Sequence, residues 1–161
     1  MTSAAAADFR ARVATRAGRA DLLVLSLGRE RFALPLGVVA EVIDVPDARA
    51  LTGAGALRHA VAPYRGALVP VFSGGAVLGV ADPTGEAVLV VLRDGGRPLA
   101  LLADAAQAVP EVDLGGLCDF PPDGIVIGVL RVAAALVALI DADALAAACR
   151  RGAHPLQQAS A

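Results

Sequence analysis

The stretch that decides the fold is Tyr64-Arg65-Gly66-Ala67-Leu68-Val69-Pro70-Val71, in which an Arg-Gly pair leads directly into a short apolar strand. Gly66 suits a tight turn, because glycine adopts positive φ angles without steric cost. Pro70 removes one hydrogen bond from a ladder, so we expect its strand to lie at a sheet edge or at a bulge. The turn therefore presents Arg65 at the surface.

Apolar runs on either side of this stretch have the length and composition of β-strands. Turns rich in glycine join them into hairpins, and the turn Arg93–Arg97 is a strong hairpin signal. Short strands at a spacing of roughly ten residues, with little helix, favour a small-barrel architecture. The expected strands are 22–27, 31–34, 68–72, 87–92, 98–102, 104–112, 125–131 and 134–140.

The segments between these strands carry weaker signals. Residues 37–45 mix the helical and strand periods, and Gly74-Gly75 suggests a brief helical turn. Residues 46–61 predict a loop with a short helix near Leu57, and residues 113–124 predict a long loop. Asp141 suits the cap of a last helix, which we expect to end at Arg151.

The chain divides into a folded part and two terminal segments. Residues 1–20 are rich in alanine and arginine and predict a flexible or weakly helical extension. Residues 21–151 predict the folded domain, with two barrel subdomains and a boundary near residues 80–86. Residues 152–161 predict a carboxy-terminal tail.

Composition excludes several classes of protein. A formal net charge of −2 over 161 residues argues against nucleic acid as the main partner, since nucleic acid favours a strongly basic face. Cys118 and Cys149 lie far apart without a CxxC or CxxH companion, so we expect no metal site. No apolar run approaches the roughly 20 residues that span a bilayer, and the amino terminus lacks the order of a secretory signal. We therefore expect a cytoplasmic protein without direct membrane insertion.

Catalytic residues do not converge in the sequence. His59 and His154 lie far apart, and we interpret both as surface imidazoles. No serine lies in a GxSxG elbow, and no glycine-rich stretch has the context of a phosphate-binding loop. We expect no enzyme activity and no cofactor. After these exclusions, the candidate functional residues are Glu41 and Arg65. The two can form an ion pair across a groove, and Arg65 offers a guanidinium that faces a partner.

Several short motifs follow one another in a fixed order along residues 21–150. Phe32-Ala33-Leu34 precedes Val39-Ala40-Glu41-Val42, which precedes Arg65-Gly66 and Val69-Pro70-Val71. In this order the sequence resembles CheW, the family of chemotaxis adaptors that link bacterial chemoreceptors to the histidine kinase CheA. The resemblance implies a mainly β fold of two intertwined SH3-like five-stranded barrels with a carboxy-terminal helix. It also implies a non-catalytic protein whose partners are a methyl-accepting-type chemoreceptor, held in the groove between the barrels, and a CheA-type kinase.

The resemblance implies a set of receptor-binding residues. Arg65 and Gly66 match the family's Asn-Leu-Arg-Gly turn, which is implicated in receptor binding. Glu41 matches the acidic residue that can pair with this arginine, and Val39 matches an apolar receptor-contacting position. Ala60 stands where the family usually has a glycine.

The kinase-facing surface of the family lies on the first barrel, where Val45 and Leu51 are the apolar candidates in this sequence. The same barrel departs from the family pattern, because Pro63-Tyr64 replaces Asn-Leu and Ser73 replaces an acid after the Pro-Val strand. Two alternatives to the two-partner adaptor therefore stay open. One is a diverged CheW-like protein that keeps receptor binding but lacks kinase binding, and the other is a regulatory scaffold module outside receptor arrays.

Overall fold

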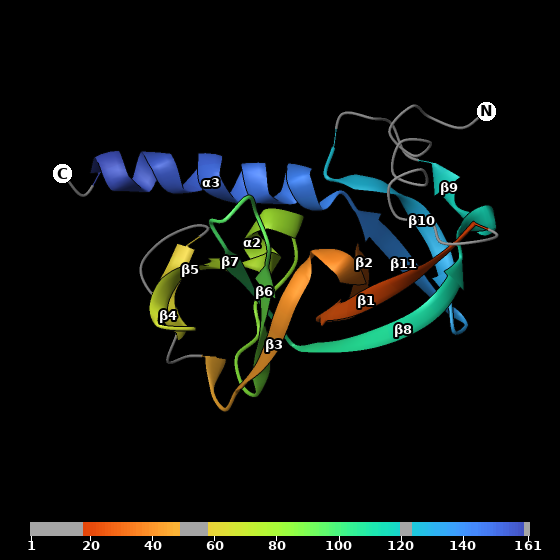
Figure 1. The fold of residues 1–161 in the computed structure, drawn as a ribbon, viewed down its shortest axis with the longest axis horizontal. Coiled ribbons are helices and arrows are strands. Elements are labelled where there is room, and N and C mark those ends of the chain that lie inside the picture. The colour runs from red at the N-terminus through yellow and green to blue at the C-terminus, as the bar shows by residue number, and fades with distance from the viewer. Residues whose placement is uncertain (1–17, 49–57, 120–123, 160–161) are drawn as a thin grey trace.

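The computed structural model describes residues 18–48, 58–119 and 124–159 (Figure 1). Within these ranges the chain forms mostly strands, followed by one long helix. The elements in chain order are β1 (Arg19–Leu27), β2 (Glu30–Pro35), the 3-10 turn η2 (Leu36–Val38), β3 (Val39–Val45), β4 (Arg58–Tyr64), β5 (Ala67–Ser73), α2 (Gly74–Leu78), β6 (Ala87–Leu92), β7 (Leu99–Ala103), β8 (Ala105–Asp113), the 3-10 turn η4 (Leu114–Gly116), β9 (Cys118–Asp119), β10 (Val126–Val132), β11 (Ala135–Ile140) and α3 (Ala142–Ala159).

The strands form two curled sheets, and the chain passes between them twice. The first sheet has the order β8-β1-β2-β11-β10-β9, and the second has the order β3-β6-β7-β5-β4. The chain leaves the first sheet after β2, builds the whole second sheet, and returns at β8. The predicted fold class is confirmed: the protein is mainly β, its sheets fit two intertwined SH3-like subdomains, and a helix ends the fold.

The passages between the sheets lie at Leu36–Val38 and at Asp104. Residues 80–86, where the sequence suggested a subdomain boundary, connect α2 to β6 within the second sheet. Local sequence patterns could not predict where the chain passes from one sheet to the other. The parallel pairs β2–β11 and β5–β7 join segments that are far apart along the chain.

Most of the predicted elements are confirmed. The three predicted hairpins are present as β1–β2, β6–β7 and β10–β11, and the mixed pattern at residues 37–45 corresponds to η2 followed by β3. The sequence did not predict β4, which we had placed in a loop, because its alanines and Pro63 weaken the strand signal. It also did not predict β9, which has two residues and therefore no periodic pattern. The helix expected near Leu57 lies outside the described residues.

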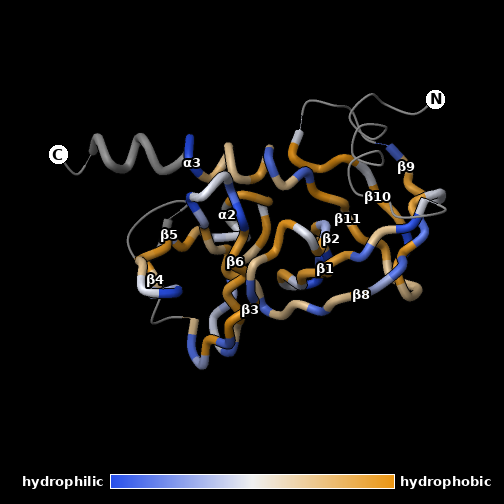
Figure 2. Tube along the Cα trace, viewed as in Figure 1, coloured by the Kyte–Doolittle hydropathy of each residue, from blue (hydrophilic) through white to orange (hydrophobic). Residues whose placement is uncertain are grey.

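Three clusters of buried side chains hold the fold together. Each sheet encloses one cluster, and the third lies where β1, β2, β6, β7 and α3 meet (Figures 1 and 2). Burial of each leucine or phenylalanine stabilises the fold by about 1.5–3 kcal/mol, so the shared cluster binds the two sheets into one body. Its largest members are Leu23, Leu25, Leu27, Phe32, Leu34, Phe72, Leu92, Leu99, Leu101, Ile140 and Leu145.

Helix α3 begins at the predicted cap. The Asp141 Oδ1 atom accepts hydrogen bonds from the backbone N–H groups of Asp143 at 3.0 Å and Ala144 at 3.3 Å. The helix runs to Ala159, through residues that we had expected to form a tail. The sequence predicted an earlier end because Gly152 and Pro155 both disfavour a helix interior, Pro155 through its missing N–H and the clash of its ring with a preceding carbonyl.

Among the prolines in strands, Pro70 and Pro110 each lie at an interruption of the hydrogen-bond ladder. The expectation of an edge strand for Pro70 was wrong, because β5 lies between β4 and β7. The pairing of β5 with β7 starts only at Val71. Pro70 itself therefore pairs only with β4, and its missing N–H interrupts no ladder with β7. Pro110 lies at a bulge in β8, where the backbone N–H of Glu111 binds Asp21 Oδ1 at 2.9 Å.

Candidate functional site

The turn between β4 and β5 displays Arg65 as the sequence predicted. Tyr64 pairs with Ala67, which leaves the two-residue loop Arg65-Gly66. Both loop residues have positive φ angles, 49° for Arg65 and 78° for Gly66, and this is the geometry of a type I′ hairpin turn. The Arg65 Cζ atom lies 5.4 Å from the centre of the Tyr64 ring. This cation–π contact restrains an exposed guanidinium at the tip of the hairpin.

The outward face of the same hairpin is apolar. The side chains of Val61 and Leu68 are 52 % and 70 % exposed, although both are large and hydrophobic. Val61 pairs with Pro70 and Pro63 pairs with Leu68, so these four residues lie on one face, which we call the hairpin patch. Ala62, Val69 and Val71 alternate with them and are buried inside the sheet. Contiguous exposed apolar residues of this kind mark interaction surfaces.

Sequence reasoning missed the hairpin patch because it did not recognise β4. The signal was present in the alternation of residues 67–71, where Leu68 and Pro70 must face away from Val69 and Val71 once the strand is assigned. What the sequence could not show is that Val61 and Leu68 stay exposed in the folded chain.

Strand β3 carries Val39 and Glu41 at an edge of the second sheet. Val39 is half-buried and pairs with Leu92, whereas Glu41 is exposed and pairs with Val91. The extra residue between them, Ala40, forms a β-bulge. The expected ion pair between Glu41 and Arg65 is absent from the described residues. Glu41 lies on β3 and Arg65 follows β4, which are the two end strands of the second sheet and do not pair with each other.

A cleft of about 510 Å³ opens where the two sheets meet. The end of β3 and the start of β6 form one wall, and the start of β8 forms the other. Asp104 is fixed there, because its Oδ2 atom accepts a hydrogen bond of 2.7 Å from the Gly28 backbone N–H. The lining combines apolar side chains with three carboxylates: Asp44, Val45, Pro46, Glu86, Ala87, Val88, Asp104, Ala105 and Ala106.

The remaining predicted binding residues are spread over the second sheet. Ala60 lies in β4 opposite Val71. Val45 is only 9 % exposed and packs into the core of the second sheet, with one side toward the cleft. Leu51 lies outside the described residues. Of the two described residues, Ala60 therefore shares the β4–β5 hairpin with Arg65, whereas Val45 belongs to β3.

The described part of the chain holds no group of three or more histidine, cysteine, aspartate or glutamate residues that could bind a metal ion. Cys149 is buried in the shared core, and this burial raises the pKa of its thiol from an ordinary value of 9.0 to about 12. A thiol that stays protonated is a poor nucleophile, so Cys149 has a packing role. Among the described helices, none is both long and apolar enough to cross a membrane.

Comparisons with known proteins agree with this architecture. Residues 21–149 match the family model of the CheW-like domain. The structure is similar to the scaffolding protein TtCheW from Thermoanaerobacter tengcongensis, with a TM-score of 0.62 over 77 % of this chain and 85 % of that one. The two sequences are 19 % identical, so this likeness concerns the fold alone. No curated protein matches the sequence. Because the family model spans nearly the whole folded chain, the protein belongs to the CheW-like domain family.

Proposed function

We propose that the protein is a non-catalytic chemosensory adaptor in the cytoplasm, which binds the tip of a chemoreceptor and couples it to a CheA-type histidine kinase. The observation that carries this proposal is the type I′ turn at Arg65-Gly66, which projects an exposed guanidinium from a rigid hairpin. Arginines held in this way are enriched at interaction hot spots. Membership of the CheW-like family supports the same role.

The proposed receptor contacts are Val39, Glu41, Ala60, Arg65 and Gly66. Recognition of a helical hairpin requires an apolar groove and a few oriented charges near it. The cleft between the sheets has apolar walls and three carboxylates, and the proposed contacts lie outside its lining, on β3 and on the β4–β5 hairpin of the second sheet. These features support a receptor helix that contacts the second sheet.

For the kinase, the hairpin patch is a stronger candidate surface than the two residues predicted from sequence. Val45 is buried, so it cannot serve as a large exposed anchor. Val61 and Leu68 offer exposed apolar side chains of the kind that dominate interface energies. The hairpin patch therefore favours the two-partner adaptor over the alternative that lacks kinase binding.

The experiment is a titration of the purified regulatory domain of the CheA-type kinase encoded in the same genome. A dissociation constant of about 10 μM or below, roughly −7 kcal/mol, supports two-partner coupling. Leu68→Asp should remove this binding, because it places a charge in the centre of the patch. The control is Leu136→Asp, since Leu136 is similarly exposed, at 64 %, but lies on β11 of the other sheet. Absence of binding by the wild type would favour the single-partner alternative or a scaffold outside receptor arrays.

A further inference from the structure

The first half of β3 has no fully buried side chain, since Val39 and Ala40 pack against the cores but stay partly exposed. The strand lies at a sheet edge and has β6 as its single neighbour in the ladder. Glu41, Val42 and Asp44 are exposed, and the η2 turn that leads into the strand buries none of its residues. Segments with little buried apolar surface open easily in local fluctuations. Another interaction must therefore fix the backbone that carries Val39 and Glu41.

Arg93, the residue that follows β6, makes this interaction. Its backbone N–H donates to the Val38 carbonyl at 2.9 Å. Its guanidinium Nη1 donates to the carbonyls of Gly37 and Val39, each at 2.9 Å. One residue thus binds three successive carbonyl groups at the entry to β3. Hydrogen bonds from a charged donor are stronger than neutral ones, and the planar guanidinium is always protonated.

These three carbonyls lie directly before the β-bulge at Ala40. A bulge redirects the side chains that follow it, so its conformation decides where Val39 and Glu41 point. We propose that Arg93 is a positioning residue, which fixes the bulge and thereby presents Val39 and Glu41 to the partner. This inference rests on the proposed receptor contact at β3. A receptor that binds a preordered strand avoids the cost of ordering it on binding.

Hydrogen exchange of Arg93→Ala, with Arg29→Ala as the control, tests the positioning role. Arg29 is exposed in the β1–β2 turn, and among the described residues it forms no hydrogen bond or ion pair. Arg29→Ala therefore changes the net charge as Arg93→Ala does, without removing a contact. We expect the amides of residues 38–43 to exchange on the order of tenfold faster in Arg93→Ala, because loss of the guanidinium hydrogen bonds to the Gly37 and Val39 carbonyls lets the entry to β3 open more often. The backbone N–H of residue 93 still donates to the Val38 carbonyl in this variant. Exchange in β10 and β11 should stay unchanged, and Arg29→Ala should match the wild type throughout.

Binding of the purified helical-hairpin tip of a chemoreceptor from the same genome tests the functional consequence. Arg93→Ala should bind this fragment about three- to tenfold more weakly than Arg29→Ala, and Arg93→Lys should recover part of the loss. Unchanged exchange at residues 38–43, or equal affinities for the two alanine variants, would overturn the inference. If the wild type does not bind the receptor tip, the proposed function fails, while the exchange data still decide whether Arg93 orders β3.

Discussion

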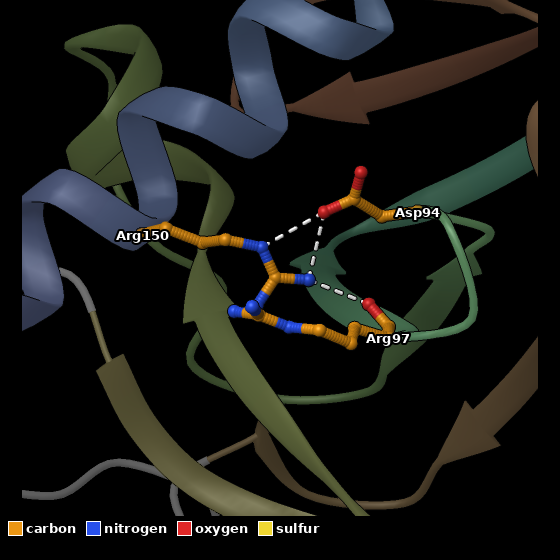
Figure 3. A network of polar contacts seen from close by, with 3 residues as sticks. All are labelled: Asp94, Arg97 and Arg150. Carbon is orange, nitrogen blue, oxygen red and sulfur yellow. Dashed lines mark hydrogen bonds and ion pairs between the residues drawn. The ribbon is translucent and has the colours of Figure 1, made fainter.

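Arg150 on α3 forms an ion pair with Asp94 in the turn between β6 and β7 (Figure 3). Both its Nη2 and its Nε atoms lie 2.8 Å from Asp94 Oδ2, and Nη2 also donates to the Arg97 carbonyl. The pair attaches the helix to the second sheet, at a point beyond the buried residues Leu145 and Cys149. The β6–β7 turn also contains Arg93, so the same turn contacts both α3 and the entry to β3.

Replacement of Arg150 should lower the free energy of unfolding modestly. The side chains of Arg150 and Asp94 are about one-third exposed, and solvent screening weakens their ion pair. We therefore expect Arg150→Ala to lower the free energy of unfolding by about 1 kcal/mol. Chemical denaturation measures this cost. Arg151→Ala is the matched control, because Arg151 is exposed on the same helix, and its removal should have almost no effect. Equal destabilisation by both variants would show that helix charge, rather than the contact with Asp94, is responsible.

Replacement of Gly66 should strain the turn that presents Arg65. Its φ of 78° is readily adopted only by glycine, and so Gly66→Ala should cost about 1 kcal/mol of unfolding free energy. Gly85→Ala serves as the control, since a Cβ atom there meets nothing within 4 Å and the φ angle is not positive. Thermal unfolding of both variants tests this prediction, and a Gly66→Ala variant as stable as Gly85→Ala would contradict the observed turn geometry.

The raised pKa of Cys149 predicts a loss of stability in alkaline solution. Between pH 9 and 12 the thiol ionises in the unfolded chain but stays protonated in the fold. The folded state then binds more protons, so the free energy of unfolding falls as the pH rises, by about 1.4 kcal/mol per pH unit at most. Below pH 9 this group contributes no pH dependence.

Denaturation at a series of pH values measures this slope. Cys149→Ala removes the thiol, and this variant should show a smaller decline in stability between pH 9 and 12 than the wild type. Thiol labelling of the native protein gives a second readout, because exposed Cys118 should react readily and buried Cys149 only after unfolding. Identical pH slopes for the variant and the wild type would show that Cys149 is not protected from ionisation in the fold.

Local patterns in the sequence were sufficient to predict the three hairpins β1–β2, β6–β7 and β10–β11 and the tight turn at Arg65-Gly66. An Arg-Gly pair between two short strands requires positive φ angles, and the turn at residues 93–97 pairs its flanking strands directly. The cap at Asp141 follows from the same kind of local chemistry. These elements form through contacts between residues close together along the chain.

The relative placement of the strands could not be predicted in the same way. Strand β2 pairs with β11 over more than 100 intervening residues, and nothing in the local pattern of either strand indicates the other. The sequence suggested an ion pair between Glu41 and Arg65, whereas the structure places Glu41 on one end strand of the second sheet and Arg65 directly after the other, without an ion pair between them. The Arg93 hydrogen bonds to Gly37 and Val39 depend on the same non-local arrangement.

Calorimetric titration of a chemoreceptor's helical-hairpin tip into the wild type and into Arg65→Ala tests the central claim most directly. Because Arg65 is exposed and stacks on Tyr64 at the tip of the hairpin, its removal should leave the fold intact. The account predicts that the wild type binds the receptor tip and that Arg65→Ala binds it about 1–3 kcal/mol more weakly. Equal affinities of the two correctly folded proteins, or no binding by the wild type, would contradict it.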